Sequence, residues 1–108
     1  MDYQLVLTTC PDEQTAHQLA EHLIREHLAA CVSCLPGVRS FYEWEGKIER
    51  AQEVQLLIKT RAERYADLEQ AIRQQHPYEV PELIALPITA GLAGYLEWID
   101  TQVNVNNA

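Results

Sequence analysis

Residues 38–60 read VRSFYEWEGKIERAQEVQLLIKT, two alternating, apolar-rich segments separated by Glu45-Gly46-Lys47. A period of two is typical of β-strands, and a glycine between two such segments is typical of a hairpin turn. We therefore expect a hairpin whose second strand covers about residues 51–60. Its first strand begins upstream at 30–34 and is interrupted by Pro36-Gly37, which predicts a bulge or bend. Such a hairpin is long for a chain of 108 residues.

The segments on either side of the hairpin complete an alternating order of strands and helices. Pro11 followed by two acidic residues is typical of a helix start, because proline and negative charge both suit the first turn. Thr60-Arg61-Ala62-Glu63 has the spacing of a capping box and predicts the start of a second helix. The expected elements are a strand over 3–9, a helix from Pro11, the hairpin over 30–60, a helix ended by Pro77, a strand over 82–86 stopped by Pro87, and a helix over 92–103.

This order predicts an α+β fold, the ferredoxin-like βαββαβ sandwich, with a long hairpin and an extra carboxyl-terminal helix. Right-handed crossovers place both main helices on one face of a four-stranded antiparallel sheet and leave the other face open. On the second strand of the hairpin, Val54, Leu56 and Ile58 alternate with Glu53 and Leu57, so both faces carry apolar side chains. Apolar side chains on both faces predict that several copies associate by strand pairing.

Size and composition limit the class of protein. With 108 residues and 47% hydrophobic residues, we expect one globular domain over 1–103 and a frayed tail over 104–108. A net charge of −8 repels phosphate backbones and argues against a nucleic-acid partner. No apolar run approaches the roughly 20 residues of a membrane span. The acidic start, which leads directly into a strand, predicts no secretory signal and a cytoplasmic location.

The connection after the second helix, HPYEVPE over 76–82, is the first candidate for a site. Its two prolines stiffen the backbone, which lowers the entropy lost when side chains are held in place. His76 with Glu79 and Glu82 offers an imidazole and two carboxylates, a donor set that suits copper or zinc. A helix stop followed by a strand start explains the same residues without a ligand.

The cysteines and the one strand-end lysine are the other candidates. Cys10 lies at a strand-to-helix turn, where a helix amino terminus can lower the pKa of a thiol, although the pattern favours a buried free cysteine, which is common. Cys31 and Cys34 face opposite sides of a strand and do not form a redox pair. Lys59 precedes the expected helix start and could hold a phosphate or carboxylate there, or reach into solvent. Glu53 lies about 20 Å from it along the strand, so contact between Lys59 and that carboxylate needs another chain or strand.

Five blocks of the sequence resemble one known family. They are Leu28-Ala29-Ala30-Cys31-Val32, Tyr42-x-Trp44-x-Gly46, Glu53-Val54 with Leu57-Ile58-Lys59-Thr60, His76-Pro77-Tyr78-Glu79-x-Pro81-Glu82, and Tyr95-Leu96-x-Trp98. In order and spacing they are similar to the CutA divalent-cation tolerance proteins. The resemblance implies a ferredoxin-like homotrimer, architecturally similar to PII-type signalling proteins and linked to tolerance of copper and other divalent cations.

The resemblance also implies a cleft between subunits and a metal site. The residues that it places in the cleft are Lys59, Glu53, Tyr42, Trp44, Glu79, Glu82 and Tyr95. The expected metal ligands are His76, which matches the family's motif, and Cys10, which lies two residues beyond Thr8 on the same side of the strand and could partly replace the family's cysteine. Some family members carry a cysteine and a further histidine where this chain has Thr8 and Gln75.

The expected function is therefore a non-enzymatic response to divalent cations by a homotrimer that binds copper(II) or a similar ion weakly and needs no obligatory cofactor. One alternative is a PII-like sensor that binds a small anionic metabolite or nucleotide at Lys59, between subunits. A third hypothesis is a hydrolase or lyase that uses Lys59 and a glutamate.

Overall fold

The computed structural model describes residues 2–103 and has the predicted order of strands and helices. The predicted tail over 104–108 lies outside the described residues. The elements are β1 (Tyr3–Cys10), α1 (Glu13–Arg25), β2 (Cys31–Trp44), β3 (Lys47–Arg61), α2 (Tyr65–Gln75), β4 (Leu83–Ile88) and α3 (Ala93–Gln102), with a short 3₁₀ turn over Ala62–Arg64.

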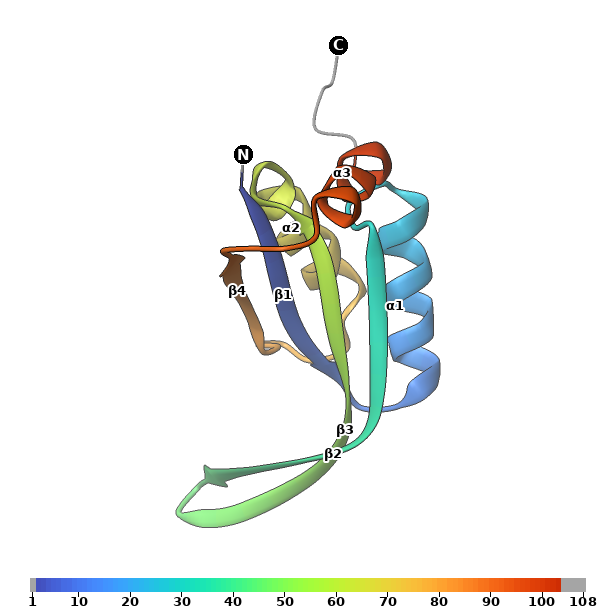
Figure 1. Ribbon diagram of the computed structural model, residues 1–108. Helices are drawn as coiled ribbons and strands as arrows, with labels where there is room; N and C mark the ends of the chain where they lie inside the picture. Colours follow the sequence, from blue (N-terminus) through green and yellow to red (C-terminus); the bar gives the residue numbers. More distant parts are fainter. Residues whose placement is uncertain (1, 104–108) are drawn as a thin grey trace.

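The described strands form one antiparallel sheet in the order β2-β3-β1-β4. Figure 1 shows α1 and α2 behind this sheet and α3 in front of one end of it. Strand order and helix placement are those of the ferredoxin-like fold, so this prediction is confirmed. No helix within residues 2–103 combines the length and the apolar character that crossing a membrane requires.

The main core lies between the sheet and the two helices behind it. Helix α1 begins at Asp12, whose carboxylate accepts a hydrogen bond from the Thr15 amide at 2.8 Å. It buries a stripe of apolar residues at helical spacing, and α2 does the same. The largest fully buried side chains of this core are Val6, Leu19, Leu23, Leu56, Ile58, Leu68 and Ile72.

The hairpin is as long as predicted and its second strand is longer. The ladder breaks between Leu35 and Val38, where Gly37 has φ +79°, so the predicted bulge is confirmed. Pairing then continues to Trp44 opposite Lys47, with a two-residue turn between them. Glu45 and Gly46 both have positive φ, as a tight hairpin turn requires. The predicted start of the second strand near residue 51 was therefore too late, because so tight a turn leaves no unpaired residues.

The predicted capping box is wrong. Thr60 and Arg61 belong to β3, a 3₁₀ turn follows, and α2 begins only at Tyr65, without a side-chain cap. The buried Thr60 hydroxyl instead donates to the Leu28 carbonyl oxygen at 2.7 Å. A buried hydroxyl must find a partner, and here the loop before β2 supplies it.

The predicted stop of the last strand at Pro87 is also wrong. Strand β4 runs through Pro87, which pairs with Gln4 of β1. Because β4 is an edge strand, its outer side needs no ladder hydrogen bond, and an edge tolerates proline.

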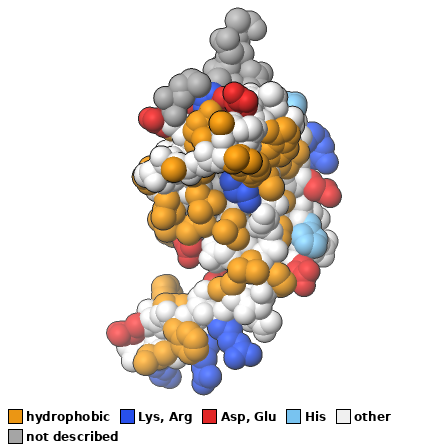
Figure 2. Space-filling view, in the orientation of Figure 1, with side chains coloured by type: hydrophobic (Ala, Val, Ile, Leu, Met, Phe, Trp, Pro, Cys, Tyr) orange, Lys and Arg blue, Asp and Glu red, His pale blue; other side chains and the backbone are white. Residues whose placement is uncertain are grey.

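The front face of the sheet is open except where α3 covers one end. Ile84 and Leu86 of β4 lie on this face and are 51% and 41% exposed. Figure 2, which looks at this face, shows hydrophobic side chains spread across it and along the projecting hairpin. The prediction of two partly apolar sheet faces is confirmed.

Candidate functional site

A buried carboxylate marks the end of the sheet from which the hairpin projects. Glu53 of β3 is only 8% exposed. Its two oxygens accept hydrogen bonds from the Ser40 hydroxyl at 2.7 Å and the Tyr78 hydroxyl at 3.0 Å. Ser40 comes from β2, and Tyr78 from the connection between α2 and β4, so three separate parts of the chain meet here. We call Glu53, Ser40, Tyr78 and His76 the carboxylate cluster.

His76 is fixed by hydrogen bonds at both ring nitrogens. The Tyr78 amide donates to Nδ1 at 3.1 Å, which requires Nδ1 to be an acceptor. Nε2 therefore carries the proton and donates to the Thr9 carbonyl oxygen at 2.6 Å. The His76 and Tyr78 rings also lie 4.9 Å apart. His76 thus holds the stiff connection against the end of β1, and Pro77 orders the backbone between the two rings.

The Tyr78 hydroxyl stays protonated over a wide pH range. Burial is the main cause that raises its pKa, and the hydrogen bond to Glu53 with the charge of that carboxylate adds to it. Together they raise the pKa of Tyr78 to about 12. Tyr78 is therefore a hydrogen-bond donor in this cluster and not a base.

Cys10 is the buried free cysteine that the sequence favoured, and it does not have the lowered pKa that a helix amino terminus could give. Its side chain is fully buried, and burial followed by the negative charges of Cys34, Asp12 and Glu53 raises the pKa of the thiol to about 11. Cys10 is the last residue of β1, and Asp12, not Cys10, caps α1. The helix amino terminus therefore does not compensate for the cost of burying a thiolate.

The predicted metal ligands do not fit a preformed divalent-metal centre. His76 has no free ring nitrogen, and Cys10 is a protonated thiol at neutral pH. Within residues 2–103 there is no group of three or more histidine, cysteine, aspartate or glutamate side chains placed to hold a metal ion. Metal binding through His76 and Cys10 stays a prediction, and it would require the His76 ring to give up one of its two hydrogen bonds.

Lys59 lies near the other end of the sheet, apart from the carboxylate cluster. Its ammonium group donates to the Ser33 hydroxyl at 2.9 Å and to the Leu57 carbonyl oxygen at 3.4 Å. Since α2 begins at Tyr65, Lys59 is not at a helix amino terminus, and that basis for an anion site is absent.

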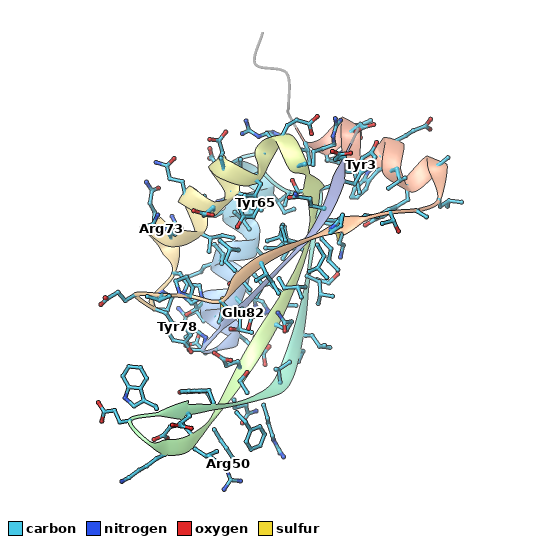
Figure 3. All side chains as sticks on the ribbon, turned by 90° about the vertical axis from the view of Figure 1, so that its left-hand side faces the viewer. Tyr3, Arg50, Tyr65, Arg73, Tyr78 and Glu82 are labelled. Atoms are coloured by element: carbon cyan, nitrogen blue, oxygen red, sulfur yellow. The ribbon has the colours of Figure 1, made fainter. Side chains whose placement is uncertain are left out.

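The remaining cleft candidates occupy three places. Glu79 and Glu82 are exposed on the connection after α2, and Glu79 and Tyr78 line a polar hollow of about 360 Å³ with Arg73. Figure 3 shows Tyr78 and Glu82 on the side of the body from which the hairpin projects. The other three residues lie elsewhere: Tyr42 and Trp44 on the exposed part of the hairpin, and Tyr95 on α3.

One chain therefore brings together only part of the predicted cleft. Glu53, His76, Glu79 and Glu82 lie on or beside the carboxylate cluster, whereas Lys59 and Tyr95 lie at the opposite end. Tyr78 and Ser40 were not predicted as site residues. Tyr78 stands in the quoted HPYEVPE segment, where a phenol between two prolines was a usable signal, but Ser40 carries no such mark.

The chain matches known proteins along almost its whole length. The model of the CutA1 divalent ion tolerance protein family matches residues 4–102. The chain belongs to the CutA1 family. The divalent-cation tolerance protein CutA of Pectobacterium atrosepticum is 45% identical over 102 residues, which cover 94% of this chain and 93% of that protein. The CutA tolerance family is not a known enzyme family.

Solved CutA structures have the same fold. CutA1 from Oryza sativa superposes with a TM-score of 0.96 at 40% identity and covers 98% of this chain and 97% of its own. CutA from Xylella fastidiosa gives 0.93 at 45% identity, with 96% and 100% covered. A structure from Archaeoglobus fulgidus, described as a periplasmic divalent cation tolerance protein CutA, gives 0.91 at 38% identity, with 94% and 99% covered.

Proposed function

We propose that this chain works as a non-enzymatic homotrimer in the tolerance of divalent cations, in the cytoplasm. Membership of the CutA1 family supports the link to divalent cations. The observation that carries the trimer is the amount of apolar surface left uncovered on one chain. Phe41, Trp44 and Ile48 on the hairpin are 62%, 62% and 79% exposed, and Ile84 and Leu86 are exposed on the open sheet face. Monomeric proteins rarely leave patches of this kind in water.

The trimer would also bring together, between neighbouring chains, polar residues that lie far apart within one chain. Glu53 is buried with two hydroxyl donors, and among residues 2–103 no ion pair to it is formed. Burying a carboxylate is costly without a compensating charge. A neighbouring copy that brings its Lys59 towards Glu53 would supply one, as expected for a cleft between subunits.

Copper(II) or a similar divalent ion is the proposed ligand, bound weakly. The exposed carboxylates of Glu79 and Glu82 can approach a cation without breaking a hydrogen bond of the cluster. His76 could join them only after losing its bond from the Tyr78 amide or to Thr9. We therefore expect carboxylate substitutions to weaken cation binding more than substitution of His76.

Sedimentation equilibrium of the native protein at micromolar concentration tests the assembly. We expect a single species with three times the chain mass. A folded single-chain species under these conditions would contradict the proposal.

Calorimetric titration of the trimer with copper(II) and zinc tests the ligand. We expect weak, saturable binding that Glu79→Gln with Glu82→Gln reduces, and His17→Gln serves as the control for histidines exposed on α1. Binding that is lost in His17→Gln and kept in the double variant would contradict the proposed location.

A PII-like anion sensor and a hydrolase or lyase have less support. Both need Lys59 in a reactive or anion-binding setting, but its ammonium group is bonded to Ser33 and lies away from a helix start. Glu53, the nearest candidate acid on the same strand face, is six residues and about 20 Å away along β3.

A further inference from the structure

Two opposite charges line the polar hollow beside α2 without forming an ion pair. The hollow has a volume of about 360 Å³ and is lined by Gln70, Arg73 and Gln74 of α2 and by Tyr78 and Glu79 of the connection that follows. Small-molecule sites commonly have volumes of about 300–1,000 Å³. Among residues 2–103, no ion pair joins Arg73 to Glu79 or to another carboxylate. Each of the two charges can therefore take a partner in the hollow.

The α2 side of the hollow suits an anionic group. Gln70, Arg73 and Gln74 are three and four residues apart, so their side chains are neighbours on the exposed side of the last turns of the helix. Figure 3 shows Arg73 there and Tyr78 on the connection below it, at the same side of the molecule. A guanidinium group can bind a carboxylate through two parallel hydrogen bonds, and a carboxamide beside it can donate further ones.

The other side of the hollow is a connection that is fixed at both ends to β1. At its start, His76 donates to the Thr9 carbonyl oxygen at 2.6 Å. At its end, the Glu82 carbonyl oxygen accepts a hydrogen bond from the Thr8 hydroxyl at 2.7 Å. A backbone held in this way loses little entropy when a ligand binds to it. The carboxylate of Glu79, which lies between the two fixed ends, is therefore preorganised for a positively charged group.

Neither a free polycarboxylate nor a free divalent cation matches both sides. The chain has a net charge of −8 and Glu79 lines the hollow, so a free polycarboxylate would be repelled. A free cation would meet Arg73, and residues 2–103 contain no group of three or more histidine, cysteine, aspartate or glutamate side chains that could hold it. Zinc in proteins is usually tetrahedral, so Glu79 and Glu82 alone leave coordination positions open. A chelating anion can fill those positions, and the cation reduces its negative charge.

We propose that the hollow binds a divalent cation as its complex with a small polycarboxylate, with the cation on Glu79 and a remaining carboxylate of the anion on Arg73. The inference rests on the proposed cation site at Glu79 and Glu82, and it names the form in which the cation is bound. Because each half of the complex pairs with one charge of the hollow, the complex binds more tightly than either half alone.

Equilibrium dialysis of the native protein against radiolabelled citrate, with and without zinc, tests the proposal. We expect citrate to be retained only when zinc is present. Arg73→Gln should weaken this retention about fivefold, the upper end of what an exposed ion pair contributes. The same substitution should not weaken calorimetric binding of zinc alone. Arg73→Lys keeps the charge without the planar guanidinium group and should recover part of the loss.

Arg25→Gln is the matched control, because it removes an exposed arginine from the last turn of α1 instead of α2. It makes the same change in net charge as Arg73→Gln and should leave the retention of citrate unchanged. Since both arginines are exposed, both variants should fold.

Four results would overturn the proposal. Equal retention of citrate without zinc would make the hollow a plain anion site. Retention of labelled alanine without zinc, in place of zinc citrate, would assign both charges to an amino-acid zwitterion. Equal retention by Arg73→Gln and the unaltered protein would place the complex elsewhere. Zinc that binds alone but is removed from the protein by citrate would overturn this inference and leave the proposed cation site intact. Binding of neither zinc nor zinc citrate would overturn both.

Discussion

The two ends of the β2–β3 hairpin differ although the same two strands form both. At the base, Leu56 and Ile58 are fully buried in the main core, so the helices cover one face of the hairpin there. Beyond the bulge at Gly37, all residues from Phe41 to Arg50 are exposed, including the three aromatic rings of Phe41, Tyr42 and Trp44. The base therefore contributes to the stability of the chain, whereas the far end has side chains that only another molecule can cover.

The largest effect is expected at the base. Leu56→Ala should lower the free energy of unfolding by about 3 kcal/mol, because it removes buried apolar contacts and leaves a cavity. Denaturant unfolding measures it. Val80→Ala, at a side chain that is 85% exposed, is the control and should change little. Equal losses in the two variants would mean that the base is not packed as described.

At the far end, Trp44→Ala should weaken assembly instead. Large aromatic side chains at the centre of an interface often contribute about 2 kcal/mol or more, so we expect the trimer to dissociate at concentrations where the unaltered protein stays assembled. Sedimentation velocity measures this, and circular dichroism should show that each chain keeps its fold. Ile24→Ala, at an exposed apolar residue of α1, should leave the mass unchanged.

Alkaline pH should destabilise the base through two groups whose pKa values are raised, the buried Cys10 thiol and the Tyr78 hydroxyl. The pKa of Cys10 is raised to about 11 and that of Tyr78 to about 12, both above the values of an unfolded chain. Unfolding therefore favours loss of these protons. Stability is complete below about pH 9, falls as pH rises towards 11 because of Cys10, and falls further towards 12 because of Tyr78.

Cys10→Val should remove the first part of this fall, about 2 kcal/mol between pH 9 and pH 11. Unfolding free energies measured at several pH values, at one protein concentration, give the slope. Tyr78→Phe should leave that first part in place and remove the later one. A slope that neither substitution alters would assign the alkaline loss to other groups.

The smallest effect is expected at the start of α1. The pKa of Asp12 is lowered by its hydrogen bonds with Thr15, so the capping contribution is present at neutral pH and is lost as acid protonates the carboxylate. Asp12→Ala should lower Tm by a few degrees and leave assembly unchanged. Asp12→Asn retains a capping oxygen, and a drop as large as that of Asp12→Ala would mean that the cap does not stabilise α1.

The sequence predicted the fold because its strongest patterns are local. The apolar stripe of α1, the alternation along β3 and the Pro36-Gly37 bulge all report backbone geometry within a few residues. Its errors at Thr60 and Pro87 arose where tertiary context decides. Thr60 bonds a carbonyl 32 residues away instead of its own helix, and Pro87 is tolerated because β4 happens to be an edge.

The site was predictable only in part for the same reason. HPYEVPE stood out as a stiff segment, but its imidazole serves the Thr9 carbonyl and the Tyr78 amide, and no local pattern shows that. The raised pKa of Cys10 depends on burial behind α1 and on Glu53 from another strand. The hydrogen bonds and pKa values of such groups depend on which strands become neighbours in the folded chain.

The bulge after Leu35 limits how the length of the β2–β3 hairpin can vary among relatives. Because successive side chains on a strand point in opposite directions, one inserted residue beyond it would swap Tyr42 and Trp44 with Phe41 and Glu43. Matched insertions of two residues in each strand would preserve the pattern. Among relatives, the strands of this hairpin should therefore differ in length by even numbers of residues.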